Sequence, residues 1–243
     1  MSVIAGVHGV VPEYRYPQEI LTAEFSKLVS PDGSHHSVIA RIHQATGVRN
    51  RNISLPLDAY RDRLDFGSTN NEFIRVGMDL GQHAIEGALK KAGVSASDVD
   101  LIISTSVTGL AVPSIDSRLI PILNFRPDIK RLPSFGLGCV AGATGIARLH
   151  DYLLGNPDGV AILLSIELCS LTVQSDDLSM ANIVASGLFG DGAAAVVMLG
   201  ARRALSMGIA SPRVISSRSR IYAESEDAIG WDIKETEIGR AHV

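Results

Sequence analysis

The chain is predicted to fold as an α/β protein around one mostly parallel sheet that is covered on both faces. Segments with helical periodicity alternate with short apolar runs, and these segments are long enough to be crossovers between parallel strands. Of the 243 residues, 46% are hydrophobic and 20% are charged, which suits a compact chain with an ample core. No stretch rich in Pro, Gly and Ser divides the sequence, so we expect one domain.

The elements are expected in the following order. Residues 3–11 predict a first strand, because they are apolar but lack the basic leader of a signal peptide and the length of a membrane span. Residues 72–92 predict a helix, with Asn70 and Asn71 as candidate N-caps and Gly93 as its stop. The remaining elements are a strand at 101–107, a short buried strand at 132–135, a helix from 140 to 155, a strand at Val160–Leu168, a helix at Met180–Leu188 and a strand at 193–199.

The most informative motif is GLGCVAG at 136–142. It fixes Cys139 in a glycine-flanked turn between a strand and the first turn of a helix. The free backbone N–H groups and the positive end of such a helix favour a thiolate. Small residues after the cysteine are expected to let this helix pack close to neighbouring backbone, in a central and buried position. The motif therefore predicts a nucleophilic cysteine.

Two other interpretations of this motif stay open. A free cysteine is often an inert core residue. The motif also satisfies the G-x-G-x-x-A pattern of dinucleotide-binding proteins, which needs an acidic residue about 20 positions further on. Asp151 comes too early for that role and Glu167 too late, so the dinucleotide interpretation is the weaker one.

Composition excludes several classes of partner. The net charge is −4 and no run of Lys or Arg occurs, which disfavours binding to nucleic acid or to an anionic membrane. The two cysteines, Cys139 and Cys169, form no C-x-x-C pair, so a reducing cytoplasm is expected rather than a disulfide framework. No zinc-ligand pattern is present, and we expect neither a metal site nor a cofactor.

A general base for Cys139 is not evident in the sequence. His150 lies eleven residues further along the same helix, which places it about 16 Å away at the helical rise per residue. Five other histidines lie in polar or loop stretches and are expected to be ordinary surface residues: His8, His35, His36, His43 and His83.

Three motifs together carry a family resemblance. GLGCVAG at 136–142, SIELCSLT at 165–172 and GLFGDGAAA at 187–195 resemble the type III polyketide synthases, the chalcone synthase family of the thiolase superfamily. VTGLAVPS at 107–114 makes the chain most similar to actinobacterial alkylpyrone synthases within that family. The resemblance implies a thiolase-like α/β fold, of which this chain is the N-terminal half of the duplicated five-layer αβαβα core.

The resemblance also implies site residues. Cys139 matches the acyl-accepting nucleophile, and Phe189 matches the aromatic gatekeeper between the pantetheine tunnel and the cavity. Cys169 and Thr172 match positions that line the starter pocket. Two further matches are Val112, in the loop that reaches toward the partner subunit's cavity, and Arg41, at the CoA phosphates.

One part of the CoA site departs from the family. The lysines near Arg41 are replaced by Val38 and Ala45, although Arg49 and Arg51 could supply charge there.

The family's histidine and asparagine, which stabilise the enolate and the oxyanion, belong to a C-terminal half that this sequence does not contain. The family-like pattern runs to about 231–233, and EIGRAHV at 237–243 resembles a translated sequencing adapter. We therefore expect an N-terminal domain at 1–236, truncated before the C-terminal domain, and a tail at 237–243 of no biological origin. The fragment itself is expected to be inactive as a polyketide synthase, because decarboxylation and the oxyanion lack these donors.

The resemblance implies a cytoplasmic acyltransferase that is a homodimer when complete. It would condense a medium- or long-chain acyl-CoA with malonyl-CoA through a thioester on Cys139 and release alkyl pyrones. The alternatives are a ketoacyl-ACP synthase-like condensing enzyme of the same superfamily, which would bind a carrier protein, and a non-catalytic binding or dimerisation module.

Overall fold

The computed structural model describes residues 1–61, 65–225, 230–234 and 237–242. Contacts along the chain divide it into two compact units. Unit 1 comprises residues 1–10, 77–167 and 193–221, and unit 2 comprises residues 11–76, 168–192 and 222–243. The boundary expected at residue 236 and the end of the expected tail at Val243 lie outside the described residues.

Unit 1 is built on one mixed sheet. Its helices and strands are β1 (Ser2–Val10), the second part of α3 (Phe66–Ala92), β4 (Leu101–Ser106), α4 (Ile115–Ile122), β5 (Lys130–Phe135), α5 (Ala141–Gly155), β6 (Val160–Leu168), β7 (Asp191–Gly200), α7 (Ala201–Ser206) and β8 (Arg213–Val214). The described strands are ordered β5-β4-β6-β7-β1-β8. β4 runs parallel to β5 and β6, as expected for crossover connections, whereas β1 runs antiparallel to β7 and β8.

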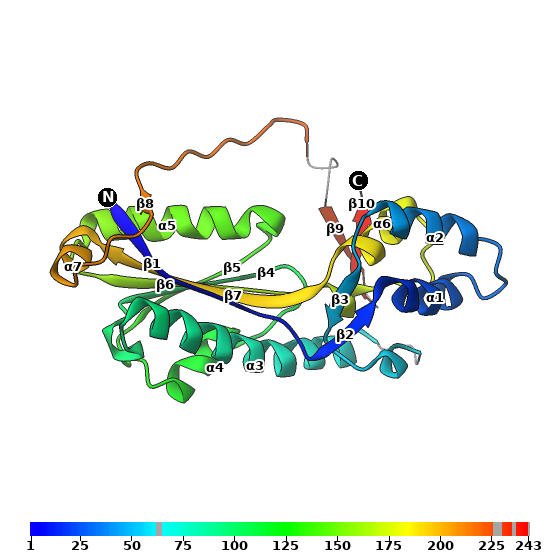
Figure 1. The fold of residues 1–243 in the computed structure, drawn as a ribbon, viewed down its shortest axis with the longest axis horizontal. Coiled ribbons are helices and arrows are strands. Elements are labelled where there is room, and N and C mark those ends of the chain that lie inside the picture. The colour runs from blue at the N-terminus through cyan, green and yellow to red at the C-terminus, as the bar shows by residue number, and fades with distance from the viewer. Residues whose placement is uncertain (62–64, 226–229, 235–236, 243) are drawn as a thin grey trace. The chain divides into compact units, whose positions relative to one another are not determined.

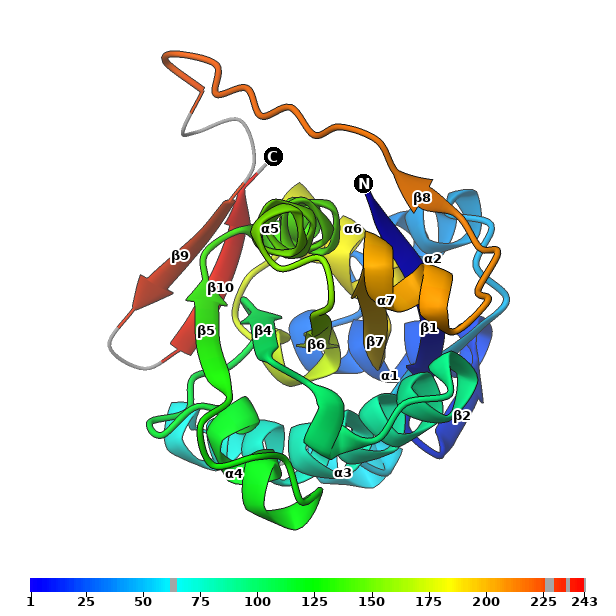
Figure 2. The same ribbon diagram turned by 90° about the vertical axis from the view of Figure 1, so that its left-hand side faces the viewer.

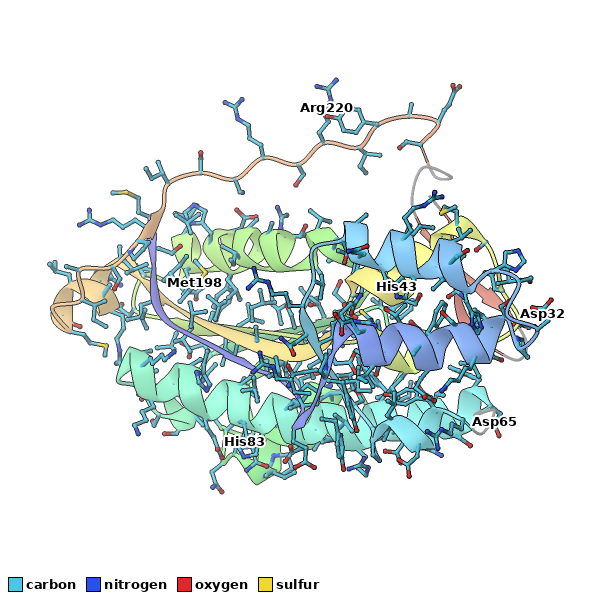
Figure 3. All side chains as sticks on the ribbon, turned by 45° about the vertical axis from the view of Figure 1, so that its right-hand side comes forward. Asp32, His43, Asp65, His83, Met198 and Arg220 are labelled. Atoms are coloured by element: carbon cyan, nitrogen blue, oxygen red, sulfur yellow. The ribbon has the colours of Figure 1, made fainter. Side chains whose placement is uncertain are left out.

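The sheet is covered on both faces. α5 lies over one face, and α3 and α4 lie over the other (Figures 1 and 2). Gly145 lets α5 approach β6, because a Cβ at this position would lie 2.5 Å from Leu163 Cδ1. This confirms the close packing predicted from the small residues of the helix. Between α5 and the sheet lies a cluster of buried apolar side chains: Leu101, Ile103, Leu149, Leu153, Ala161, Leu163 and Met198, the last of which is labelled in Figure 3.

Unit 2 is mainly helical. It contains β2 (Tyr14–Pro17), α1 (Gln18–Val29), α2 (His36–Ala45), β3 (Asn50–Ile53), the start of α3, α6 (Met180–Leu188), β9 (Gly230–Lys234) and β10 (Glu237–His242), with short 3₁₀ turns η1 (Leu57–Tyr60) and η4 (Cys169–Thr172). β2 pairs antiparallel with β3, and β9 with β10. Phe25, Val29, Ile39 and Ile183 bring α1, α2 and α6 together around one core.

Several boundaries predicted from the sequence are confirmed, and others are wrong. β6 and α6 have the predicted bounds. α3 begins at Phe66 rather than at 72, so Asn70 and Asn71 lie inside it, and Gly93 follows its end with φ +68°. β5 is a strand as predicted but not a buried one: it lies at an edge of the sheet, and Leu132 and Phe135 are 47% and 48% exposed.

None of the helices in the described part of the chain has the length and apolar character needed to cross a membrane.

Candidate functional site

Cys139 lies where the sequence predicts, in unit 1 between β5 and α5. Gly136 and Gly138 have φ of +89° and +56°, and nothing lies within 4 Å of a Cβ built on either. The left-handed backbone, and not crowding, therefore makes glycine the favoured residue at both positions. Residues Gly138–Val140 form a 3₁₀ turn that leads directly into α5, and the Cys139 side chain is exposed.

This exposure corrects one expectation. The helix was predicted to be central and buried, yet Val140 directly before it is largely exposed, and α5 buries only one face, through residues such as Leu149 and Leu153. The first N–H groups of a helix have no acceptor within the helix, and here the Ala141 N–H donates to the Gly138 carbonyl of the preceding turn. An exposed thiol at such a turn is accessible to a reactive carbonyl carbon.

Within unit 1, the histidine on the same helix does not supply a base to Cys139. His150 is buried, and its Nδ1 lies 2.8 Å from Ser2 Oγ, which gives it a structural role. No hydrogen bond from a described residue of unit 1 reaches the Cys139 thiol.

His43 corrects the expectation of a surface residue. It is buried on α2 (Figure 3). Its Nδ1 lies 2.9 Å from Thr22 Oγ1, and its Nε2 lies 3.0 Å from the Ile183 carbonyl oxygen. Burial lowers the pKa of His43, so the imidazole is a neutral link between α1, α2 and α6.

Unit 2 contains a pocket of about 410 Å³. It brings together three residues that the family resemblance selected: Cys169 and Thr172 from η4, and Phe189 directly after α6. The opposite wall comes from α1, β3 and η1. The apolar part of the lining is Leu21, Phe25, Leu28, Ile53, Leu57, Val173, Ala185 and Phe189, while Glu24, Lys27, Arg51, Tyr60, Arg61, Ser170, Asn182 and Ser186 add polar groups. A pocket of this size and lining can hold an extended apolar ligand.

A buried cluster of hydrogen bonds fixes η4 against the start of β7. We call it the Asp191 cluster; it consists of Asp191, Ser54, Ser170 and Tyr60. The Asp191 carboxylate accepts hydrogen bonds from the hydroxyl of Ser54, at 2.5 Å, from the hydroxyl of Ser170, and from the backbone N–H of Ser170, at 2.8 Å. Tyr60 OH lies 2.6 Å from Ser170 Oγ and accepts from the Leu55 N–H at 3.2 Å.

The directions of these bonds follow from counting protons. Because the Ser170 hydroxyl donates its one proton to Asp191, it must accept from Tyr60. Burial raises the pKa of Asp191 and that of Tyr60. The phenol therefore keeps its proton and donates it to Ser170, whose hydroxyl donates in turn to the Asp191 carboxylate.

The sequence interpretation missed the Asp191 cluster, and it treated Arg51 only as a source of charge for CoA. A signal was available for Asp191, because an acidic residue between two glycines at the start of an apolar strand is unusual unless it is bonded. No comparable signal marked Tyr60.

The other two predicted site residues are not part of the pocket lining. Arg41 is exposed on α2, at a position where charge can face solvent. Val112 lies in unit 1 in the loop after β4 and is 95% exposed, and its bond to Pro113 is cis. Among the described residues, no group of three or more His, Cys, Asp or Glu side chains is gathered to hold a metal ion.

Comparison with known proteins assigns the family. The family pattern described as chalcone and stilbene synthases, N-terminal domain, matches residues 8–202. The chain is 47% identical over 230 residues to a 1,3,6,8-tetrahydroxynaphthalene synthase of Streptomyces peucetius subsp. caesius, covering 95% of this chain and 60% of that protein. It is 33% identical to a putative chalcone synthase of Bacillus subtilis strain 168, covering 97% of this chain and 66% of the relative.

The fold leads to the same family. The crystal structure of 1,3,6,8-tetrahydroxynaphthalene synthase from Streptomyces coelicolor A3(2), a bacterial type III polyketide synthase, matches with a TM-score of 0.89 at 30% identity. The match covers 97% of this chain and 66% of that one. The thiolase-like α/β fold expected from the sequence is thereby confirmed. The chain spans about 60% of the length of the relative that is 47% identical to it.

Proposed function

The chain belongs to the chalcone and stilbene synthase family, and on that premise we propose that it supplies the cysteine-bearing part of a type III polyketide synthase. One observation carries the proposal: Cys139 is an exposed thiol on a turn with two left-handed glycines, at the first turn of α5. The sulfur attacks the thioester carbonyl of an acyl-CoA, an S–C bond forms, CoA leaves as its thiol, and the acyl group remains on the enzyme. Malonyl-CoA then supplies the extending units.

For the product, we propose an alkyl pyrone made from a medium- or long-chain acyl-CoA. The pocket of unit 2 supports this, because apolar side chains from α1 and β3, together with Phe189, line it beside Cys169 and Thr172. A second candidate product is tetrahydroxynaphthalene, which the name of the 47% identical relative favours. The two candidates differ in the starter that the enzyme accepts, which would be a long acyl chain for the first.

The remaining assignments complete the proposal. Phe189 is the gate of the pocket, and Cys169 and Thr172 are the wall that limits the starter. Val112 reaches toward the cavity of a second subunit in a homodimer, and Arg41 contacts the CoA phosphates. The enzyme acts in the cytoplasm on acyl-CoA and malonyl-CoA.

The test is acyl transfer to Cys139 followed by mass spectrometry of the intact chain and of its peptides. The chain is incubated with decanoyl-CoA, palmitoyl-CoA, acetyl-CoA or malonyl-CoA, beside Cys139→Ala and Cys169→Ser. We expect a long acyl group on Cys139 that is absent in Cys139→Ala and retained in Cys169→Ser. Preferential transfer from malonyl-CoA would favour the tetrahydroxynaphthalene candidate instead.

Two outcomes would replace the proposal. Acyl transfer from an acyl carrier protein but from no acyl-CoA would indicate a ketoacyl-ACP synthase-like enzyme. A folded chain on which Cys139 accepts no acyl group from any donor would indicate a non-catalytic module.

A further inference from the structure

The C-terminal end of α6 is held by side chains from two other elements. The last carbonyl groups of a helix lack donors within the helix. Here the Gly187 carbonyl accepts a hydrogen bond from Gln18 Nε2 at 2.7 Å, and the Phe189 carbonyl accepts one from Arg51 Nη1 at 2.8 Å. Arg51 Nε also donates to Gln18 Oε1 at 2.9 Å. Gln18 and Arg51 therefore form one unit that binds both carbonyl groups.

This arrangement fixes the backbone of Phe189 on both sides. Its N–H donates to the Ala185 carbonyl at 3.0 Å, and its carbonyl is bound by Arg51. The backbone is extended at Phe189, with φ −85° and ψ 140°, so its carbonyl has no donor within α6. The Arg51 guanidinium supplies a donor from outside the helix. The positive charge also lies at the negative end of the α6 dipole. Two separate effects thus hold the residue that forms one wall of the pocket.

The geometry argues against a role for Arg51 at the CoA phosphates. Arg51 lines the pocket and is half-buried, and burial lowers the pKa of its guanidinium. Two of its N–H groups already have protein acceptors. No carboxylate of the described residues forms an ion pair with it. A planar fork that donates in two fixed directions suits a residue that sets the position of a backbone segment.

We propose that Arg51, oriented by Gln18, is a positioning residue that holds Phe189 in the wall of the unit 2 pocket and so controls access to that pocket. The proposal deepens the proposed function, since it assigns what keeps the gate in place. It predicts that loss of the guanidinium fork opens the pocket even when a positive charge remains.

The experiment uses the two native cysteines of the 243-residue chain. Cys169 lines the pocket, and Cys139 is an exposed thiol in unit 1. The rate of alkylation of each thiol by iodoacetamide is measured by peptide mass spectrometry, and the ratio of the Cys169 rate to the Cys139 rate reports access to the pocket. The variants are Arg51→Met, Arg51→Lys and Phe189→Ala. The matched control is Arg15→Met, an exposed arginine on the neighbouring strand β2.

We expect the ratio to rise about tenfold in Arg51→Met, because a hydrogen bond to a charged group shifts an equilibrium by at least that factor. Arg51→Lys should give a rise of similar size, and Arg15→Met none. Phe189→Ala should raise the ratio as well, and adding Arg51→Met to it should change little, because Arg51 acts through Phe189. A cooperative urea transition would show that each variant is folded.

Two results would overturn the proposal. One is a ratio of Cys169 to Cys139 alkylation that stays at the wild-type value in both Arg51→Lys and Gln18→Leu. These are the mildest changes to the guanidinium fork and to the side chain that orients it. The other is an effect of Arg51→Met that adds in full to that of Phe189→Ala. Because acyl transfer is measured on Cys139 and access on Cys169, failure of the proposed function and failure of this inference give different results.

Discussion

Replacing Ser170 with Ala should destabilise the chain more than removal of any other hydroxyl of the Asp191 cluster. Ser170 Oγ donates to Asp191, and accepts from Tyr60 OH at 2.6 Å and from the Ser54 N–H at 3.3 Å. The substitution leaves two buried donors without an acceptor and the carboxylate with one donor fewer. An unsatisfied buried donor costs about 1–3 kcal/mol, so the total loss is about 3–5 kcal/mol.

Tyr60, at the end of the Asp191 cluster, should contribute less to stability than Ser170. Tyr60→Phe removes one donor and leaves the Leu55 N–H without its acceptor at 3.2 Å, a loss of about 1–2 kcal/mol. In the Ser170→Ala background the same change should cost less, since the phenol has already lost its acceptor and only the hydrogen bond from the Leu55 N–H remains to be removed. The two substitutions should therefore be non-additive.

The assay is urea unfolding followed by circular dichroism on the four chains of this double-mutant cycle. Ser219→Ala is the control, because Ser219 is exposed, and it should change the free energy of unfolding by less than about 0.5 kcal/mol. Additive effects of Ser170→Ala and Tyr60→Phe would refute the assigned directions of the hydrogen bonds. A Ser170→Ala chain as stable as the control would refute the cluster itself.

Three further predictions concern unit 2. Gly187→Ala should lower the free energy of unfolding in urea by about 2–3 kcal/mol, because the new Cβ would lie 2.5 Å from His43 Cδ2. The control Gly142→Ala on α5, with nothing within 4 Å of the new Cβ, should cause no loss. Equal losses in the two variants would contradict this prediction. Burial lowers the pKa of His43, so its contribution to stability is complete above the pKa of about 6.5 that histidine has in the unfolded chain. That contribution is lost as the pH falls below this value, at no more than about 1.4 kcal/mol per pH unit. His43→Gln should therefore reduce the difference in unfolding free energy between pH 7.5 and 5.5, and an unchanged difference would count against a buried neutral His43. Thr172→Phe fills part of the pocket, so calorimetry should show weaker binding of palmitoyl-CoA and unchanged binding of acetyl-CoA; equal losses for both would place Thr172 outside the starter site.

Local sequence patterns predicted much of the fold, and the failures have local causes. β6 and α6 were placed correctly because each is a continuous apolar or amphipathic run with clear ends. The start of α3 was missed because two asparagines resembled an N-cap. The cap is Asp65, whose carboxylate accepts from the Ser68 N–H at 2.7 Å, as a side chain at this position does.

Features that depend on distant partners were not predictable from the sequence. The antiparallel direction of β1 is set by its pairing with β7, about 190 residues away. His43 was taken for a surface residue because of its type, although it lies one turn after the buried Ile39 on the same face of α2. Its partner Ile183 is 140 residues away. Periodicity could have indicated the burial of His43 but not what it binds.

The same distinction applies to the site. Cys139, Cys169, Thr172 and Phe189 could be predicted as site residues because each lies in a motif of consecutive residues. The groups that hold the last three in place were not found, because Ser54 reaches Asp191 across 137 positions and Arg51 reaches Phe189 across 138. No local pattern records such a contact.

The two kinds of residue around the pocket should therefore respond differently to substitution. The segments 169–172 and 189–191 that carry its predicted site residues lie at a 3₁₀ turn and at a helix end, where backbone groups need partners from elsewhere. Apolar contact alone is non-directional and would let these segments shift, whereas hydrogen bonds from Arg51 and Ser170 fix distance and angle. Changes to Thr172 or Val173 should then alter which ligand fits while leaving the walls in place. Changes to Arg51 or Ser170 should move the walls themselves, so their effects should appear with every ligand, whatever its chain length.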